Sequence, residues 1–292
     1  MKKRNILISS ILSVALATSL YANEATQSKE IKSVQNKVNN STHLSLKSKK
    51  HDIVKEAINT INNTNLVLDA LDKKDTKKAL DLLANISGKL DVIIAQDPNL
   101  ELLPVSISSV EHDLIIDKDT VFKIKKEAIK AIRDDRLQDA RKLIKDLASE
   151  VVITTTSIPL VTYPSDIKAI VPLISNGKLE DAKLALHALL NSLVITKEVI
   201  ALPVLRAKFL LENAEVLAEN KKRDNKKDEE LKVLIDVSKY QLELAQSLGY
   251  GTKDDFKPIY EQLEIIQDKI KNKNNGVGWF DKIKEKIKNL NN

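Results

Sequence analysis

The sequence contains no cysteine, and this one absence excludes several classes of protein. Without a thiol, the chain cannot carry a disulfide framework, a cysteine nucleophile or the acyl anchor of a lipoprotein. Aromatic residues are also scarce, at 3% of the chain. Leucine, isoleucine, valine and alanine must therefore fill the interior, and such a composition favours helices packed against helices.

The familiar catalytic signatures are missing as well. The chain has no HExxH, GxGxxG, GxSxG or phosphate-loop pattern. Glu111, His112 and Asp113 are adjacent metal-ligating residues, but neighbours in an extended segment point to opposite faces and chelate a metal poorly. The sequence thus predicts no catalytic residue, no cofactor and no metal, in a protein that is not an enzyme.

Residues 1–22 have the layout of a secretory signal. A charged start, KKR, precedes residues 6–17 (ILISSILSVALA), an apolar core that is too short to span a bilayer. Cleavage after Ala22 leaves a normal polar segment before the cut, and cleavage after Ala17 is the alternative because it fits the small-x-small rule. We therefore expect an exported, periplasmic protein.

The charge of the mature chain is modest. The whole chain carries a net charge of +6, and removing the signal takes away three positive charges and no acidic group, which leaves +3. A nucleic-acid partner would need a concentrated basic face. We therefore expect no binding to nucleic acid.

Composition divides the rest of the chain into three parts. Residues 23–50 are rich in asparagine, serine and lysine, and we interpret them as a disordered polar tether. Residues 51–273 show apolar residues at three- and four-residue steps, which predicts one helical domain. Residues 274–292 form a basic amphipathic tail.

The helical part contains a threefold repeat centred on Ala79, Ala140 and Ala182. Each alanine follows a short polar turn and sits between two amphipathic segments, which is the pattern of an antiparallel helical hairpin. Apolar residues recur eight positions before each alanine (Leu71, Ile132, Ile174) and four positions after it (Leu83, Ile144, Leu186). The alanines are 61 and 42 residues apart, and this unequal spacing argues against a regular solenoid.

A segment rich in valine, isoleucine and threonine follows each hairpin and is bounded by proline. The prolines are Pro98, Pro104, Pro159, Pro164 and Pro203. Such segments favour short strands, because proline removes a backbone donor and stops a helix. The predicted fold is mainly α, a bundle of antiparallel helical hairpins with short β-prone, proline-bounded connectors. Apolar connectors that one copy leaves uncovered predict a homo-oligomer.

Several blocks of the sequence resemble the YfdX family of exported bacterial proteins. They are LDALDKKDTKKALDLLANISGKLDVIIAQDPNLELLPV, LIKDLASEVVITTTSIPLVTYP, NGKLEDAKLALHALLNSLVI with ALPVLRA, and YQLELAQSLGYG. Together they extend over about residues 54–271. The resemblance implies a mainly helical, periplasmic, self-associating protein linked to acid and multidrug stress, and it implies no particular reaction.

Tyr163 and Arg206 are the candidate ligand-binding residues. Arg206 follows the apolar run ALPVL, so its guanidinium is expected to be partly buried and to need a carboxylate partner. Glu150, Asp166 and Glu212 are available for that role. One interpretation is a pocket for an anion or a drug-like molecule, and the alternative is an ion pair that only holds the connectors in place.

The tail offers a second candidate surface. One helical face of GVGWFDKIKEKIKNL collects its apolar residues, and lysines dominate elsewhere. These apolar residues are Trp279, Phe280, Ile283, Ile287 and Leu290. The pattern suits peripheral contact with a membrane surface, and docking on the bundle or on another subunit is the alternative.

The balance of charges suggests a response to acid. Protonating the 41 acidic residues leaves 47 basic residues to repel one another, so the fold should loosen below about pH 5. The expected function is a non-enzymatic periplasmic stress protein that binds misfolded clients or small apolar ligands. An adaptor for protein partners and a membrane-surface protein are the alternatives, and ordinary acid denaturation is the alternative to an acid switch.

Overall fold

The computed structural model describes residues 9–51, 55–114 and 117–290, so residues 2–4, the charged start of the expected signal, lie outside the described residues. The fold is mainly α with one small sheet, as the sequence predicts. The helices are α1 (Ser9–His51), α2 (Lys55–Asp72), α3 (Thr76–Gln96), α4 (Lys118–Arg133), α5 (Leu137–Ile144), α6 (Tyr163–Ser175), α7 (Leu179–Asn191), α8 (Leu202–Glu219), α9 (Asn225–Leu248), α10 (Lys253–Lys271) and α11 (Asp281–Leu290). The strands are β1 (Leu102–His112), β2 (Glu150–Pro159) and β3 (Val194–Ala201).

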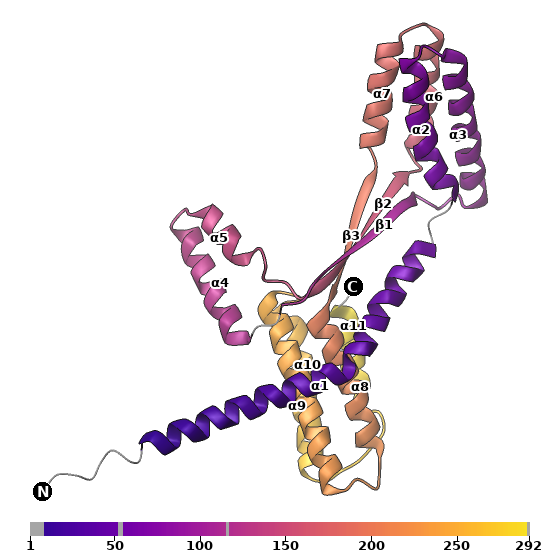
Figure 1. Cartoon of the computed structure of the whole chain (residues 1–292). Coiled ribbons are helices and arrows are strands. Elements are labelled where there is room, and N and C mark those ends of the chain that lie inside the picture. Colours follow the sequence, from indigo (N-terminus) through magenta and orange to yellow (C-terminus); the bar gives the residue numbers. More distant parts are fainter. Residues whose placement is uncertain (1–8, 52–54, 115–116, 291–292) are drawn as a thin grey trace, which may run out of the picture. The chain divides into compact units, whose positions relative to one another are not determined.

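The threefold repeat forms three helical hairpins, which confirms the prediction (Figure 1). They are α2–α3, α4–α5 and α6–α7, each followed by one strand. The turns share one backbone conformation, because Lys74, Asp135 and Gly177 all have positive φ (58°, 58° and 75°) and each lies five residues before the repeat alanine. The next amide in each turn donates to a carbonyl five residues back, at 2.8 to 2.9 Å, which is the Schellman ending of a helix.

The chain divides into two compact units, whereas the sequence pattern predicts one helical domain over residues 51–273. Unit 1 consists of Met1–Thr42, Glu111–Val151 and Val199–Asn292, and unit 2 consists of His43–Val110 and Val152–Glu198. The order of the hairpins in the sequence does not follow this division. The first and third hairpins belong to unit 2, and the second hairpin belongs to unit 1.

Unit 2 is built from two hairpins that pack on each other. Helix α3 lies against α6, and α2 lies against α7. The repeat alanines of both hairpins are fully buried, together with the apolar residues that recur around them. These residues are Leu71, Leu83, Ile86, Leu90, Ile174, Leu186 and Leu189. The apolar periodicity of the sequence therefore identifies the core of this unit.

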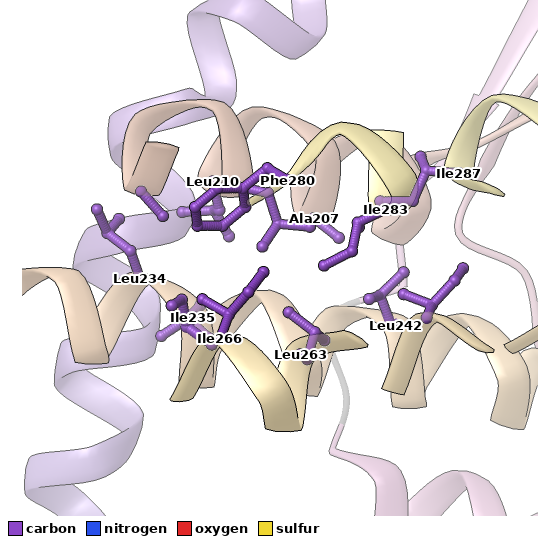
Figure 2. Close-up of a cluster of buried hydrophobic side chains, with 14 of the residues drawn as sticks. Ala207, Leu210, Leu234, Ile235, Leu242, Leu263, Ile266, Phe280, Ile283 and Ile287 are labelled. Carbon is purple, nitrogen blue, oxygen red and sulfur yellow. The ribbon is translucent and has the colours of Figure 1, made fainter. Parts of the chain in front are cut away.

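Unit 1 has its core among α8, α9, α10 and α11. Figure 2 shows apolar side chains from these helices pointing toward one another. Ala207 and Leu210 come from α8, Leu234, Ile235 and Leu242 from α9, Leu263 and Ile266 from α10, and Ile283 and Ile287 from α11, with Phe280 one residue before it.

Residues 23–50 belong to helix α1, so the prediction of a disordered tether is wrong. Ile31, Val34 and Val38 are three and four residues apart and share one helical face, and the two valines are buried. Val34 belongs to the core of unit 1, where Lys37 Nζ also donates to Asn213 Oδ1 of α8 at 2.8 Å. Three apolar residues among many polar ones give only a weak periodic signal in the sequence. Packing on α8 buries this face and thereby stabilises the helix.

The β-prone connectors form a three-stranded sheet in the order β1-β2-β3, which confirms that they are strands. Pro104 lies inside β1, an edge strand, where a missing backbone donor is tolerated. Pro159 ends β2, and Pro164 and Pro203 lie in the first turns of α6 and α8, where no intrahelical donor is required. Pro159, Pro164 and Pro203 therefore mark the end of a strand or the start of a helix, whereas Pro104 does not.

Candidate functional site

A hollow with a volume of about 930 Å³ lies within unit 2. It is lined by Glu56 of α2, by Gly88, Lys89, Val92, Ile93 and Gln96 of α3, by Asp97 and Leu100 of the loop after α3, and by Leu102, Leu103 and Pro104 of β1. Its size falls in the range of small-molecule sites, about 300 to 1,000 Å³. Sequence reasoning did not identify it, because the lining combines a helix face with a strand that follows a loop.

One face of α3 and the loop after it shape this hollow. Lys89, Val92, Ile93 and Gln96 have the spacing i, i+3, i+4, i+7, so they share a side of the helix. Gly88 adds space, because a Cβ placed on it would meet no heavy atom within 4 Å. The loop is held by the Asp97 side chain, whose Oδ1 accepts a hydrogen bond from the Asn99 amide at 3.2 Å.

The lining is mainly apolar with a few charged groups. Leu103 is buried, with 2% of its surface exposed, whereas Val92 is 57% exposed, so the lining extends from the interior to the surface. Glu56, Lys89 and Asp97 supply both signs of charge. An apolar surface with a small number of polar groups can hold an apolar molecule and orient any polar substituent it carries.

Arg206 forms a two-pronged ion pair with Asp113 in unit 1. Its Nη1 donates to Asp113 Oδ1 at 3.1 Å and its Nη2 donates to Oδ2 at 2.5 Å. Ser149 Oγ donates to the same Oδ1 at 2.9 Å, and Gln35 Oε1 lies 3.4 Å from Arg206 Nη2. The partner is therefore Asp113, and the three expected partners, Glu150, Asp166 and Glu212, are wrong.

The electrostatics of Asp113 follow from these contacts. Burial raises the pKa of its carboxyl group, but the hydrogen bonds and the positive charge of Arg206, together with the hydrogen bond from Ser149, outweigh burial and lower the pKa below its usual value. The carboxylate therefore stays charged at all but strongly acidic pH. Both terminal nitrogens of Arg206 are already engaged, which leaves only its buried Nε without a protein partner.

Tyr163 does not share its contacts with this pair. It belongs to unit 2, whereas Arg206 belongs to unit 1. Its hydroxyl is 3.2 Å from Thr64 Oγ1, and Thr64 in turn donates to the carbonyl oxygen of Thr60 at 2.8 Å. Burial raises the pKa of Tyr163, and the hydrogen bond with Thr64 offsets part of that increase. Each candidate ligand-binding residue thus has a partner within its own unit.

The Glu111-His112-Asp113 run shows no metal site. In the part of the chain that the structure describes, no three metal-ligating side chains gather at one place. The Asp113 carboxylate faces Arg206 and Ser149 instead.

Arg223 was missed as a structural residue because the run KKRDNKKDEE has the composition of a solvated charge cluster. Its side chain is only 4% exposed. Its Nε donates to Asp228 Oδ1 at 2.7 Å, its Nη1 to the Ala218 carbonyl at 2.7 Å and its Nη2 to the Asn274 carbonyl at 2.7 Å. The guanidinium thus connects the end of α8, the start of α9 and the segment before α11.

The apolar face of the C-terminal segment points into unit 1. Phe280, Ile283 and Ile287 are buried in its core, and Trp279 and Leu290 pack beside them. This is the docking alternative, and it corrects the view of residues 274–292 as a separate tail. Among the described residues, no helix combines the length and the apolar character that spanning a bilayer requires.

Comparisons with known proteins match part of this chain to a family. Residues 57–199 match the family model described as YfdX protein. A solved structure of YfdX from Salmonella Typhi is similar at 17% identity, with a TM-score of 0.36, over 51% of this chain and 93% of that one. No curated protein matches the chain. The family match covers the three hairpins except for the first two residues of α2, and it ends before α8.

Proposed function

We propose that the part of this chain that matches the YfdX family model, residues 57–199, is a binding module for small apolar molecules. The binding site is the hollow between α3 and β1 in unit 2. Every lining residue except Glu56 falls within the family region. The proposal describes a binding protein that is not an enzyme, located in the periplasm as residues 1–22 lead us to expect.

The observation that carries the proposal is an apolar hollow of drug-sized volume beside a helical glycine. Val92, Ile93 and Leu100 offer apolar surface to a ligand, and displacing water from such surface favours binding. Gly88 lies well inside α3, where glycine destabilises a helix by roughly 0.5 to 1 kcal/mol relative to alanine. A glycine at this point keeps the hollow open at a cost in helix stability.

Two substitutions of Gly88 test the proposal. Gly88→Leu projects a side chain at the hollow, and Gly88→Ala is the matched control that improves the helix while leaving most of the space open. The probe is N-phenyl-1-naphthylamine, an uncharged fluorescent molecule, titrated into the full chain. We expect the wild type and Gly88→Ala to bind with similar Kd, and Gly88→Leu to bind at least about tenfold more weakly.

Thermal unfolding of both variants checks that weaker probe binding does not result from loss of the fold. Each should unfold at the same temperature as the wild type or higher, because each replaces a mid-helix glycine. If Gly88→Leu binds the probe as tightly as Gly88→Ala, the hollow is not the site and the proposal fails.

The same hollow could take an apolar side chain of a misfolded client under acid stress, and the proposal includes this use. Client binding is measured by following the aggregation of an acid-stressed client by light scattering in the presence of equimolar protein. We expect the wild type and Gly88→Ala to slow aggregation and Gly88→Leu to do so less. If all three proteins slow aggregation to the same extent, clients do not bind at this site.

A further inference from the structure

At two positions of the repeat, the second hairpin exposes an apolar side chain where the other two hairpins bury one. Eight residues before the repeat alanine, Leu71 and Ile174 are 2% exposed, whereas Ile132 is 50% exposed. Four residues after it, Leu83 and Leu186 are fully buried, whereas Ile144 is 49% exposed. The sequence pattern is the same in all three hairpins, so the difference lies in what covers them.

In unit 2 the cover is another hairpin of the same repeat. The first helix of one hairpin packs on the second helix of the other in both directions, as α2 on α7 and as α6 on α3. This reciprocal arrangement is that of a two-fold pair, in which the same surface is used on both sides. The repeat is therefore a surface that packs on a copy of itself.

The α4–α5 hairpin lies in unit 1 and has no such cover among the described residues. Helix α4 is attached to α9, where Lys118 pairs with Glu243 and Lys125 Nζ donates to the Ser247 carbonyl at 2.8 Å. The hairpin still exposes large apolar side chains on both helices, which are Phe122, Ile129, Ile132, Leu137 and Ile144. A cluster of this kind on one small element marks an interaction surface.

We propose that this face binds the α4–α5 hairpin of a second copy of the chain. Helix α4 packs on α5 of the partner and α5 packs on α4 of the partner, which repeats between chains the pairing seen within unit 2. The inference goes beyond the proposed ligand site, because it concerns unit 1 and does not depend on the hollow. The hairpin has more basic than acidic residues, so the association should be stronger at 0.5 M salt than at 0.05 M salt.

The first test measures the mass of the full chain by sedimentation as its concentration rises. The wild type should form dimers, and the double variant Ile132→Lys/Ile144→Lys should raise the dissociation constant at least about tenfold. Val216→Lys is the matched control, because Val216 is an exposed apolar residue of unit 1 (71%) outside the hairpin. At protein concentrations too low for association, all three proteins should unfold at similar temperatures, since the replaced side chains are about half exposed or more in the single chain.

The second test uses the absence of cysteine from the native chain. A tagged Ile132→Cys chain and an untagged Ile144→Cys chain, mixed and oxidised, should form a mixed disulfide between α4 and α5 of two copies. A Val216→Cys chain mixed with Ile144→Cys should not. The inference is overturned if the wild type stays monomeric at all concentrations, if the double variant associates as well as the wild type, or if the control pair cross-links equally.

Discussion

Arg206, in the first turns of α8, and Asp113, one residue beyond β1, form a paired-fork salt bridge across 93 residues of sequence. The Arg206 side chain is 8% exposed and the Asp113 side chain is 26% exposed. Burying two charges is costly, and their attraction offsets this only when the hydrogen-bond geometry is good. Removing one partner leaves the other charge buried without compensation. Loss of either residue should therefore destabilise unit 1.

We expect Arg206→Ala to lower the free energy of unfolding by about 3 kcal/mol, because it leaves the partly buried Asp113 carboxylate without its cation. Urea denaturation at pH 7 measures the change. Lys168→Ala is the control, since Lys168 and Asp91 form an exposed pair whose loss should change stability by less than about 1 kcal/mol. An Arg206→Ala protein as stable as the control would show that Arg206 is held for another purpose, such as binding a ligand.

Acid should weaken the Arg206–Asp113 pair only at very low pH. The folded-state pKa of Asp113 lies below the value of about 3.9 for an unfolded chain. Its stabilisation is therefore fully present above that value and is lost as the pH falls through the folded-state pKa. The difference in unfolding free energy between the wild type and Asp113→Asn should stay constant from pH 7 to about pH 4.5 and shrink below about pH 4.

This prediction also separates two sources of acid sensitivity. If both proteins loosen alike near pH 5, the general charge balance is responsible and the pair is not. A difference that already shrinks between pH 6 and pH 5 would contradict a lowered pKa for Asp113.

The backbone conformation shared by the three hairpin turns favours glycine at one position of each turn. Lys74 and Asp135 adopt the left-handed conformation that Gly177 adopts in the third hairpin. A residue with a Cβ is disfavoured there by roughly 1 to 2 kcal/mol, and part of the gain from glycine is lost to its extra freedom in the unfolded chain. Lys74→Gly and Asp135→Gly should each stabilise the protein by about 0.5 kcal/mol, measured by urea denaturation.

The neighbouring Lys73 provides the control, because its φ is not positive. Lys73→Gly should leave stability unchanged or lower it, and Gly177→Ala should lower it by about 1 kcal/mol. Destabilisation by Lys74→Gly would mean that the lysine side chain contributes more than the backbone conformation does.

Helix α11 should behave as part of the core of unit 1. Ile283→Ala removes a fully buried side chain and should destabilise the protein by about 2 to 4 kcal/mol, whereas Lys282→Ala, on the exposed side, should change stability by less than about 0.5 kcal/mol. Thermal unfolding compares the two. Equal, small effects would show that α11 leaves the bundle readily, and the apolar face would then be free for a membrane surface.

Local features of the sequence account for most of the elements. Apolar steps of three and four residues, short polar turns and prolines correctly predict the three hairpins and the strands that follow them, because these choices depend on backbone geometry within a few residues. The same local logic underestimated α1, where Val34 and Val38 are two apolar residues in a polar segment. Helix α1 is stabilised mainly by tertiary packing, because α8 and its neighbours cover that face.

The sequence by itself thus determined the hairpin repeat, the strands that follow the hairpins, and the buried positions of α2, α3, α6 and α7. Only the tertiary structure decided that Asp113 is the partner of Arg206, that α11 packs into the bundle, that a hollow opens beside Gly88 and that two hairpins pair while the third exposes Ile132 and Ile144. The physical reason is the range of the interactions. Helices and turns form from neighbours in sequence, whereas partners, pockets and covered faces depend on contacts between distant segments, which local patterns do not encode.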